Sequence, residues 1–167
     1  MKILITPRSF ASASDKPMKM LTEKGYEIQL NDIGRPYKKE EMLKLIRDVD
    51  GIIIGIDELS AEIIEKANAL KVISKYGIGL DNIDINMATN NKIIVTNTPT
   101  ANLDAVADLA FGLILSLARR IPEADKKTKS GAWEKIIGKS VWEKTLGIIG
   151  LGKIGRQVVK QIGRAHV

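Results

Sequence analysis

The sequence predicts a doubly wound α/β fold, in which a parallel β-sheet carries helices on both faces. Two observations support this prediction: short β-branched runs that are apolar on both faces, and amphipathic helical stretches that alternate with them. The strands are expected at residues 2–5, 26–30, 51–54, 71–74, 92–96 and 145–149. Because strands of this kind need cover on both faces, the alternation favours a parallel sheet.

The clearest helical pattern spans residues 38–49, where apolar positions recur at i, i+3, i+4 and i+7 and charges take the other face. Ser14 and Asp15 ahead of Pro17 indicate the start of an earlier helix, and Gly25 is expected to cap its end. Ser60 is the expected N-cap of a third helix. The sequence therefore places a helix after each of the first three strands.

A longer helix is expected at residues 103–121, and it is apolar nearly all round. Its apolar run is about half of the ~20 residues that a bilayer span needs, so we expect a buried helix and no membrane contact. Such a helix must be covered on every side, which predicts that it links two domains or packs on a second copy in a homodimer. The next segment, residues 122–144 with Trp133 and Trp142, is expected to form an arm between domains.

Composition excludes several classes of protein. The 167 residues contain no cysteine, so a disulfide framework or a thiolate metal site is impossible, and no metal site is predicted. The net charge is +6, but the lysines are scattered without interleaved aromatic residues, and we expect no nucleic-acid partner. The apolar start is too short for a signal peptide, so a cytoplasmic protein is expected.

A glycine motif at residues 150–155, called the glycine loop below, follows the sixth expected strand and opens a helical pattern. In a G-x-G-x-x-G sequence, the first glycine (Gly150) allows a tight turn. The second (Gly152) lets the backbone come close to a pyrophosphate, and the third (Gly155) permits close packing of the helix on the strand. The motif predicts dinucleotide binding, and the alternative is a glycine-rich turn without a ligand. The acidic residue that would hold the ribose lies beyond residue 167.

A second glycine motif lies in residues 74–84, at the end of the fourth expected strand. Glycines at the carboxyl end of a parallel strand expose backbone N–H groups that can bind an anion, and a carboxylate would suit them. We expect the backbone of residues 77–79, called the carboxylate loop below, to contact a ligand. For Asp81 and Asp84 two interpretations stay open: ligand contact, or capping of the next helix.

These motifs occur in a recognisable order. Residues 74–84, 95–99, 102–109 and 150–155 resemble, block by block, the D-isomer-specific 2-hydroxyacid dehydrogenases, nearest to the D-3-phosphoglycerate dehydrogenase-like members. The similarity runs from residue 2 to about residue 161. One departure is Asp108, where the family more often has Glu, and we regard that change as conservative.

The resemblance implies a domain arrangement and a set of ligand contacts. Residues 1–98 would form a flavodoxin-like substrate domain, and residues 99–167 an interdomain helix, the arm and the start of a Rossmann NAD-binding domain, with substrate in the cleft between. The implied substrate-binding residues are Lys75, Gly77, Ile78 and Gly79. The implied NAD-binding residues are Gly150, Gly152, Lys153, Ile154 and Gly155.

The catalytic residues of the family, an Arg and a His–Glu pair, come after the glycine loop and have no counterpart in this sequence. His166 has no family context, so no catalytic residue is assigned and the chain alone is expected to be inactive. Its NAD binding is expected to be weak or absent. Residues 162–167 are expected to be a non-native tail, since their codons can spell a common sequencing adapter.

The predicted activity of the parent protein is hydride transfer between NAD(H) and C2 of a small D-2-hydroxy acid, with 3-phosphoglycerate in serine synthesis as the first expectation. Another 2-hydroxy or 2-oxo acid, such as glyoxylate, hydroxypyruvate or lactate, is the alternative. A non-enzymatic dimerising or ligand-binding module is the alternative from a different class. The sequence leaves NAD and NADP undistinguished.

Overall fold

The computed structural model describes residues 1–163 and divides the chain into two compact units, Met1–Pro99 and a second unit that begins at Thr100. His166 and residues 164–167 of the expected tail lie outside the described residues.

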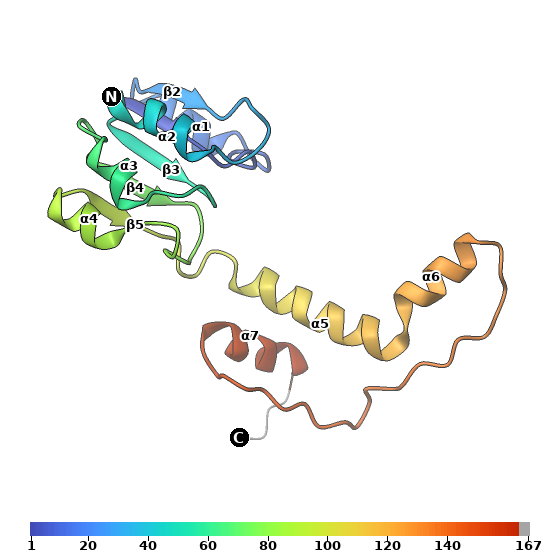
Figure 1. The fold of residues 1–167 in the computed structure, drawn as a ribbon. Coiled ribbons are helices and arrows are strands. Elements are labelled where there is room, and N and C mark those ends of the chain that lie inside the picture. The colour runs from blue at the N-terminus through green and yellow to red at the C-terminus, as the bar shows by residue number, and fades with distance from the viewer. Residues whose placement is uncertain (164–167) are drawn as a thin grey trace. The chain divides into compact units, whose positions relative to one another are not determined.

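The first unit is built on a five-stranded sheet in which every neighbouring pair is parallel (Figure 1). The strands are β1 (Lys2–Ile5), β2 (Glu27–Leu30), β3 (Gly51–Ile54), β4 (Val72–Lys75) and β5 (Ile94–Thr96). Their order in the sheet is β2-β1-β3-β4-β5, the order of flavodoxin-like doubly wound folds. The predicted α/β class and parallel sheet are confirmed, and the winding reverses between β1 and β3.

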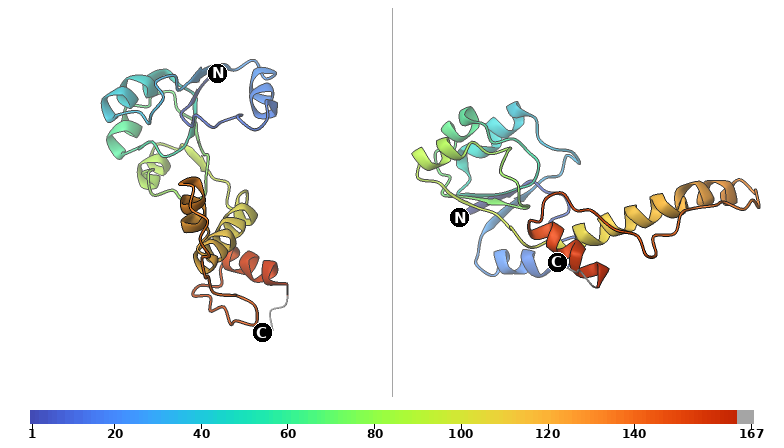
Figure 2. Two further views of the ribbon diagram at one scale, coloured as in Figure 1. Left: turned by 90° about the vertical axis from the view of Figure 1, so that its right-hand side faces the viewer. Right: turned by 90° about the horizontal axis from the view of Figure 1, so that it is seen from below.

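Helices cover both faces of this sheet. They are α1 (Lys16–Thr22), α2 (Lys39–Leu45) with the 3₁₀ turn η1 (Ile46–Asp48), α3 (Ala61–Glu65) and α4 (Ile85–Asn90). Figure 2 shows α1 on one face and α2, α3 and α4 on the other. The strand register aligns Leu4, Ile52 and Ile73 in one row, and these side chains are at most 1% exposed in the core. Burial of that row by α2, α3 and α4 is the main apolar contribution to this unit.

The helix ends match the predictions in part. Ser60 stands at the N-cap of α3 with extended backbone, as expected, although its hydroxyl has no hydrogen-bond partner within the described residues. The last helical residue of α1 is Thr22, followed by Glu23. Gly25 ends the helix as predicted, in a left-handed conformation with a φ of +71°. Its N–H donates to the Thr22 carbonyl at 2.9 Å and the Tyr26 N–H donates to the Leu21 carbonyl at 3.4 Å, the paired bonds of a Schellman cap.

The second unit contains three helices within the described residues, namely α5 (Leu103–Arg119), α6 (Ile121–Lys129) and α7 (Lys153–Ile162). The expected helix ends earlier than residue 121, because Arg120 adopts a left-handed conformation with a φ of 55°. Helices α5 and α7 pack together and bury Ala107 and Val158. No helix in residues 1–163 combines the length and apolarity needed to cross a membrane.

The strand predicted at residues 145–149 does not form, and this segment has no regular structure. A strand is stabilised by hydrogen bonds to a neighbouring strand, and the described part of the second unit contains none. The expected arm at residues 122–144 is likewise helical up to Lys129, as α6, and irregular after it.

Candidate functional site

A buried polar network lies at the carboxyl edge of the sheet in the first unit, at the ends of β1 and β3. Asp57 is 3% exposed, and both of its carboxylate oxygens are occupied. One oxygen accepts the Thr6 hydroxyl at 2.5 Å, and the other accepts the Tyr37 N–H at 2.7 Å. The Thr6 hydroxyl also accepts the Gly55 N–H at 3.2 Å. This carboxylate therefore ties the loops after β1, β2 and β3 together.

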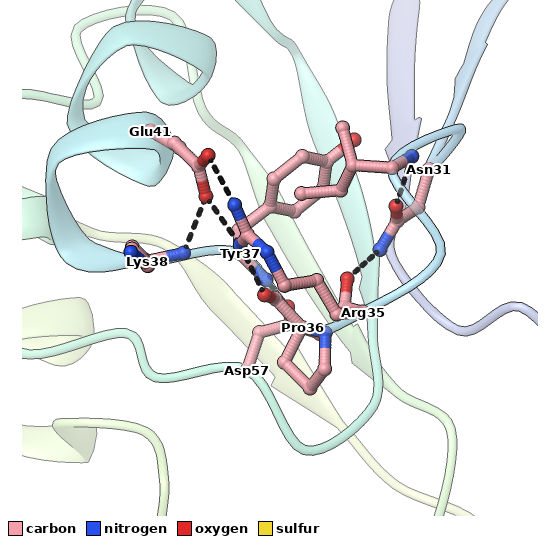
Figure 3. Close-up of polar contacts among 8 residues, drawn as sticks. Asn31, Arg35, Pro36, Tyr37, Lys38, Glu41 and Asp57 are labelled. Atoms are coloured by element: carbon pink, nitrogen blue, oxygen red, sulfur yellow. Dashed lines mark hydrogen bonds and ion pairs between the residues drawn. The ribbon is translucent and has the colours of Figure 1, made fainter.

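The loop after β2 is fixed by a second set of contacts, drawn in Figure 3. The Arg35 guanidinium binds both carboxylate oxygens of Glu41, at 2.7 and 2.8 Å, and Glu41 also accepts the Lys38 N–H at 2.7 Å. These bonds, with that from Arg35 as the largest contribution, lower the pKa of Glu41 to about 2. Asn31 donates to the carbonyl of Arg35 at 2.9 Å. The charge of Arg35 is thus matched by a carboxylate of α2, the helix that follows its loop.

Lys75, at the end of β4, turns inward rather than toward solvent. Its Nζ lies 2.6 Å from the Gly55 carbonyl oxygen and 2.6 Å from Oδ1 of Asn82. Asn82 in turn donates to the carbonyls of Gly55 and Asp57. Burial lowers the pKa of Lys75 from its usual range. Lys75 thus joins the loops after β3 and β4.

In the carboxylate loop two carbonyl groups are held in place. The Gly77 carbonyl accepts both the N–H and the hydroxyl of Thr98, each at 3.0 Å. The Ile78 carbonyl accepts Nδ2 of Asn97 at 2.9 Å. In a trans peptide the next N–H points opposite to the carbonyl, so the N–H groups of Ile78 and Gly79 face away from these partners. Neither N–H donates to any atom of residues 1–163.

The two aspartates of this segment have different surroundings. Oδ1 of Asp84 accepts the Met87 N–H at 2.8 Å and caps α4, which settles its role as a helix cap. Asp81 lies beside the carboxylate loop, where a Cβ added to Gly79 would lie 3.0 Å from Oδ2 of Asp81. A side chain at position 79 would therefore displace Asp81.

A cavity of about 450 Å³ opens at the same edge of the sheet. It is called the switch cavity below, because it lies at the topological switch point of the sheet, where the winding reverses. It is lined by the loops after β1, β2 and β3 and by Tyr76, which follows β4. These loops flank β1 and β3, between which the winding reverses. Open α/β sheets bind ligands at that position, beyond the carboxyl ends of the strands.

The glycine loop of the second unit has the backbone features that the sequence predicts. Gly150 has a φ of +92°, and a Cβ added to Gly155 would lie 2.5 Å from the Gly150 carbonyl oxygen, so neither position accepts a larger residue without strain. Gly152 is the N-cap of α7, and a Cβ there would meet nothing within 4 Å. The N–H groups of Lys153, Ile154 and Gly155 find no acceptor in the described part of the chain. They form an open helix N-terminus of the kind that binds phosphate.

Several residues that organise this edge of the sheet were not predicted as site residues from the sequence. Asn97 and Thr98 fix the carboxylate loop, and Thr6, Asp57 and Asn82 fix the loops around it. A signal was available: each is a small polar residue within a few positions of the carboxyl end of a predicted strand, or follows a glycine turn. Which of them meet across the sheet depends on strand order, which one sequence does not reveal.

Comparison with known proteins supports the family resemblance. The sequence profile described as "D-isomer specific 2-hydroxyacid dehydrogenase, catalytic domain" matches residues 4–165. The chain belongs to this family. A glyoxylate reductase of Thermococcus litoralis is 42% identical over 151 residues, which cover 84% of this chain and 46% of that protein. A D-3-phosphoglycerate dehydrogenase of Methanocaldococcus jannaschii is 42% identical over 163 residues, 96% of this chain and 30% of that protein.

A solved structure gives the same result for the fold of this chain. The NAD⁺-bound 3-phosphoglycerate dehydrogenase of Entamoeba histolytica is 32% identical with a TM-score of 0.74, and the match covers 98% of this chain and 50% of that one. The chain thus spans half or less of the length of these relatives.

Proposed function

We propose that this chain belongs to an NAD-dependent oxidoreductase that transfers a hydride between the nicotinamide cofactor and C2 of a small D-2-hydroxy acid. The observation that carries the proposal is the pair of open N–H groups at Ile78 and Gly79, held in place through the bonds that Asn97 and Thr98 make to the preceding carbonyls. Two open backbone donors on adjacent residues at a sheet's carboxyl edge suit the two oxygens of a substrate carboxylate.

The glycine loop is proposed to bind the cofactor. The residues involved are Gly150, Gly152, Lys153, Ile154 and Gly155, whose open backbone fits a pyrophosphate on the N-terminus of α7. NAD, when bound, supplies the hydride acceptor or donor. The family match and the NAD⁺-bound structural relative support this choice.

For the substrate, we propose 3-phosphoglycerate, with glyoxylate or hydroxypyruvate as the alternative. Relatives with similar identity are named glyoxylate reductase, D-3-phosphoglycerate dehydrogenase and hydroxypyruvate reductase. All these acids place a carboxylate beside the carbon that is oxidised or reduced, which the carboxylate loop would bind in each case. They differ in the group attached beyond that carbon.

The proposal includes the domains and the assembly. Residues 1–98 would bind substrate, while residues 99–167 would supply the interdomain helix, the arm and the start of the NAD domain. A homodimer is proposed because α5 buries Ala107 but exposes Leu109, Leu113 and Leu117. Exposed apolar side chains of this kind mark surfaces that contact another protein chain. We place the protein in the cytoplasm on the grounds of a sequence without cysteine.

The activity is tested on the complete product of the gene that encodes this chain. We expect NAD reduction at 340 nm with 3-phospho-D-glycerate, or NADH oxidation with glyoxylate or hydroxypyruvate. The carboxylate loop is tested on the chain itself by titration with glycolate, which should shift the amide NMR signals of Ile78 and Gly79. Glycolamide, which lacks the carboxylate, is the control. Absence of turnover together with unshifted amides would refute the proposal.

The cofactor site is tested by the substitution Gly152→Ala in the complete protein. The φ of −76° at this position accepts alanine without strain, so a loss of NAD affinity would report the methyl group between backbone and pyrophosphate. We expect affinity to fall about tenfold or more, equivalent to one lost charged hydrogen bond. Gly112→Ala in α5, another glycine with open space around it, is the matched control. Equal affinity in both variants would remove the glycine loop from the site.

A further inference from the structure

The switch cavity is lined by one cationic side chain that has no carboxylate partner within the described residues. Arg35 is paired with Glu41, and both oxygens of Asp57 accept hydrogen bonds from Thr6 and Tyr37. Arg8, in the loop after β1, also lines the cavity, and within the described part of the chain no carboxylate lies within ion-pair distance of it. The cavity therefore offers an unmatched guanidinium to a ligand.

The loop that carries Arg8 is positioned against the carboxylate loop. The rings of Phe10 and Tyr76 meet edge to face with centroids 6.1 Å apart, and Tyr76 directly precedes Gly77 in the chain. Ser9 and Ser12 add hydroxyl groups to the lining beside Arg8. A ligand whose carboxylate lies on the N–H groups of residues 78 and 79 would thus have the switch cavity next to it.

The volume of the cavity indicates a ligand larger than a two-carbon acid. About 450 Å³ falls within the usual range for small-molecule sites and exceeds what a two-carbon acid would fill. An acid with an extended chain could place its far end there, beside Arg8. A planar guanidinium binds phosphate or carboxylate oxygens in pairs, which neutral groups cannot match.

We infer that Arg8 is a specificity-determining residue that binds a second anionic group, a phosphate or a carboxylate, at the far end of a D-2-hydroxy acid. This inference rests on the proposed function, since it takes the first carboxylate to lie on the carboxylate loop. It goes beyond that function by assigning the far-end contact to the loop after β1.

The test compares acids that differ only in their far end. In the complete protein, kcat/KM is measured for 3-phospho-D-glycerate, D-malate and D-glycerate, whose far ends are a phosphate, a carboxylate and a neutral hydroxymethyl group. We expect at least one anionic acid to exceed D-glycerate, and Arg8→Gln to lower kcat/KM for that acid about tenfold or more. The value for D-glycerate should change less than about twofold, within the effect of an uninvolved surface substitution.

Two further variants serve as controls for the geometry of the donors and for the loss of a positive charge. Arg8→Lys keeps the charge without the planar pair of donors and should fall between the wild type and Arg8→Gln. Arg47→Gln removes the same charge from η1, which precedes β3 at the opposite edge of the sheet, and should leave all three acids unchanged. The acid that responds most identifies phosphate or carboxylate as the natural far end.

Several results would overturn the inference. They are an equal loss for all three acids, no loss for any, or no preference for an anionic acid over D-glycerate. Failure of the proposed function has a different signature, namely no turnover of any acid and no shift of the amide signals of residues 78 and 79.

Discussion

The two units of the chain differ in how completely they bury their apolar side chains. In the first unit, Leu4, Ile52 and Ile73 are at most 1% exposed under a layer of three helices. In the second, Ala107 is the buried residue of α5, while Leu117 is 83% exposed and Trp133 97% exposed. The first unit is therefore stabilised by its own buried core, whereas the second presents apolar surface suited to contact with another surface.

Spectroscopy can follow the units separately, because the three tyrosines lie in the first and the two tryptophans in the second. The tyrosines are Tyr26, Tyr37 and Tyr76, and the tryptophans are Trp133 and Trp142. The tyrosine signal therefore reports the unfolding of the first unit. The tryptophans are already 97% and 78% exposed in the folded chain, so the second unit is followed by the amide NMR signals of its helices.

The largest expected effect is on the core of the first unit. Ile73→Ala should lower the free energy of unfolding followed by the tyrosine signal by about 3 kcal/mol, because it opens a cavity in the centre of the sheet. Leu117→Ala in α5 should change that free energy by less than about 0.5 kcal/mol, as an exposed side chain of the other unit. Urea titrations of both variants measure the difference. Equal losses would mean that the units unfold as one.

The second prediction concerns association through α5. We expect the wild-type chain to be dimeric by sedimentation equilibrium, and Leu113→Glu combined with Leu117→Glu to weaken the dimer at least about a hundredfold, since burial of each leucine contributes about 2 kcal/mol. Met20→Glu, at an exposed apolar residue of α1 in the first unit, is the control and should leave the dimer intact. A wild-type monomer at micromolar concentration would contradict the assignment of α5 as an interface.

The contrast between the units also explains which elements could be predicted from the sequence. Four-residue runs such as 51–54 became strands at the expected positions, because several parallel neighbours share the backbone hydrogen bonds and bury both faces. Residues 145–149 carry an equally apolar pattern and form no strand, since pairing depends on neighbours rather than on the segment itself.

The candidate site shows the same limit. The glycines of the carboxylate loop and the glycine loop could be identified because glycine at a turn is a local signal. The bond from Asn97 to the Ile78 carbonyl joins residues 19 positions apart, and that between Thr6 and Asp57 spans 51. Such partners are set by the order of strands in the sheet. The inward orientation of Lys75 likewise depends on Gly55 and Asn82, which reach it from two different loops.

The third prediction tests how the carboxylate loop of the first unit is held. Asn97→Ala removes the donor to the Ile78 carbonyl, so the Gly79 N–H loses its fixed direction and glycolate affinity should fall about tenfold. Asn91→Ala removes a similar bond, to the Met87 carbonyl at the end of α4, and should leave affinity unchanged. NMR titration of the amide signals provides both values. Equal effects would show that Asn97 stabilises the unit without directing the loop.

The smallest expected effect is a pH dependence of stability that differs between the two units. The pKa of Glu41 in the folded chain is about 2, below its ordinary 4.5, because Arg35 and the Lys38 N–H bind its carboxylate. The folded state therefore binds fewer protons than the unfolded state between these values. The stabilisation is present in full above about pH 4.5 and is lost as the pH falls toward 2. In the second unit the pKa of Glu134 is also lowered, by its bond to Lys127, but a single exposed ammonium group is its partner.

Glu41→Gln keeps an oxygen for the Lys38 N–H but removes the charge and one of the two oxygens that accept from Arg35, so it should lower the urea midpoint of the tyrosine signal at neutral pH. The difference from the wild type should shrink steadily below pH 4.5 and vanish near pH 2. Glu134→Gln should change the urea midpoint of the second unit, followed by the amide NMR signals of α6, less at every pH, because one screened pair contributes little. If the Glu41→Gln difference stayed constant with pH, the effect would come from the altered hydrogen bonds of residue 41 at the start of α2 rather than from the charge. A larger effect at Glu134 than at Glu41 would mean that the second unit depends on its surface ion pairs more than its exposed apolar side chains suggest.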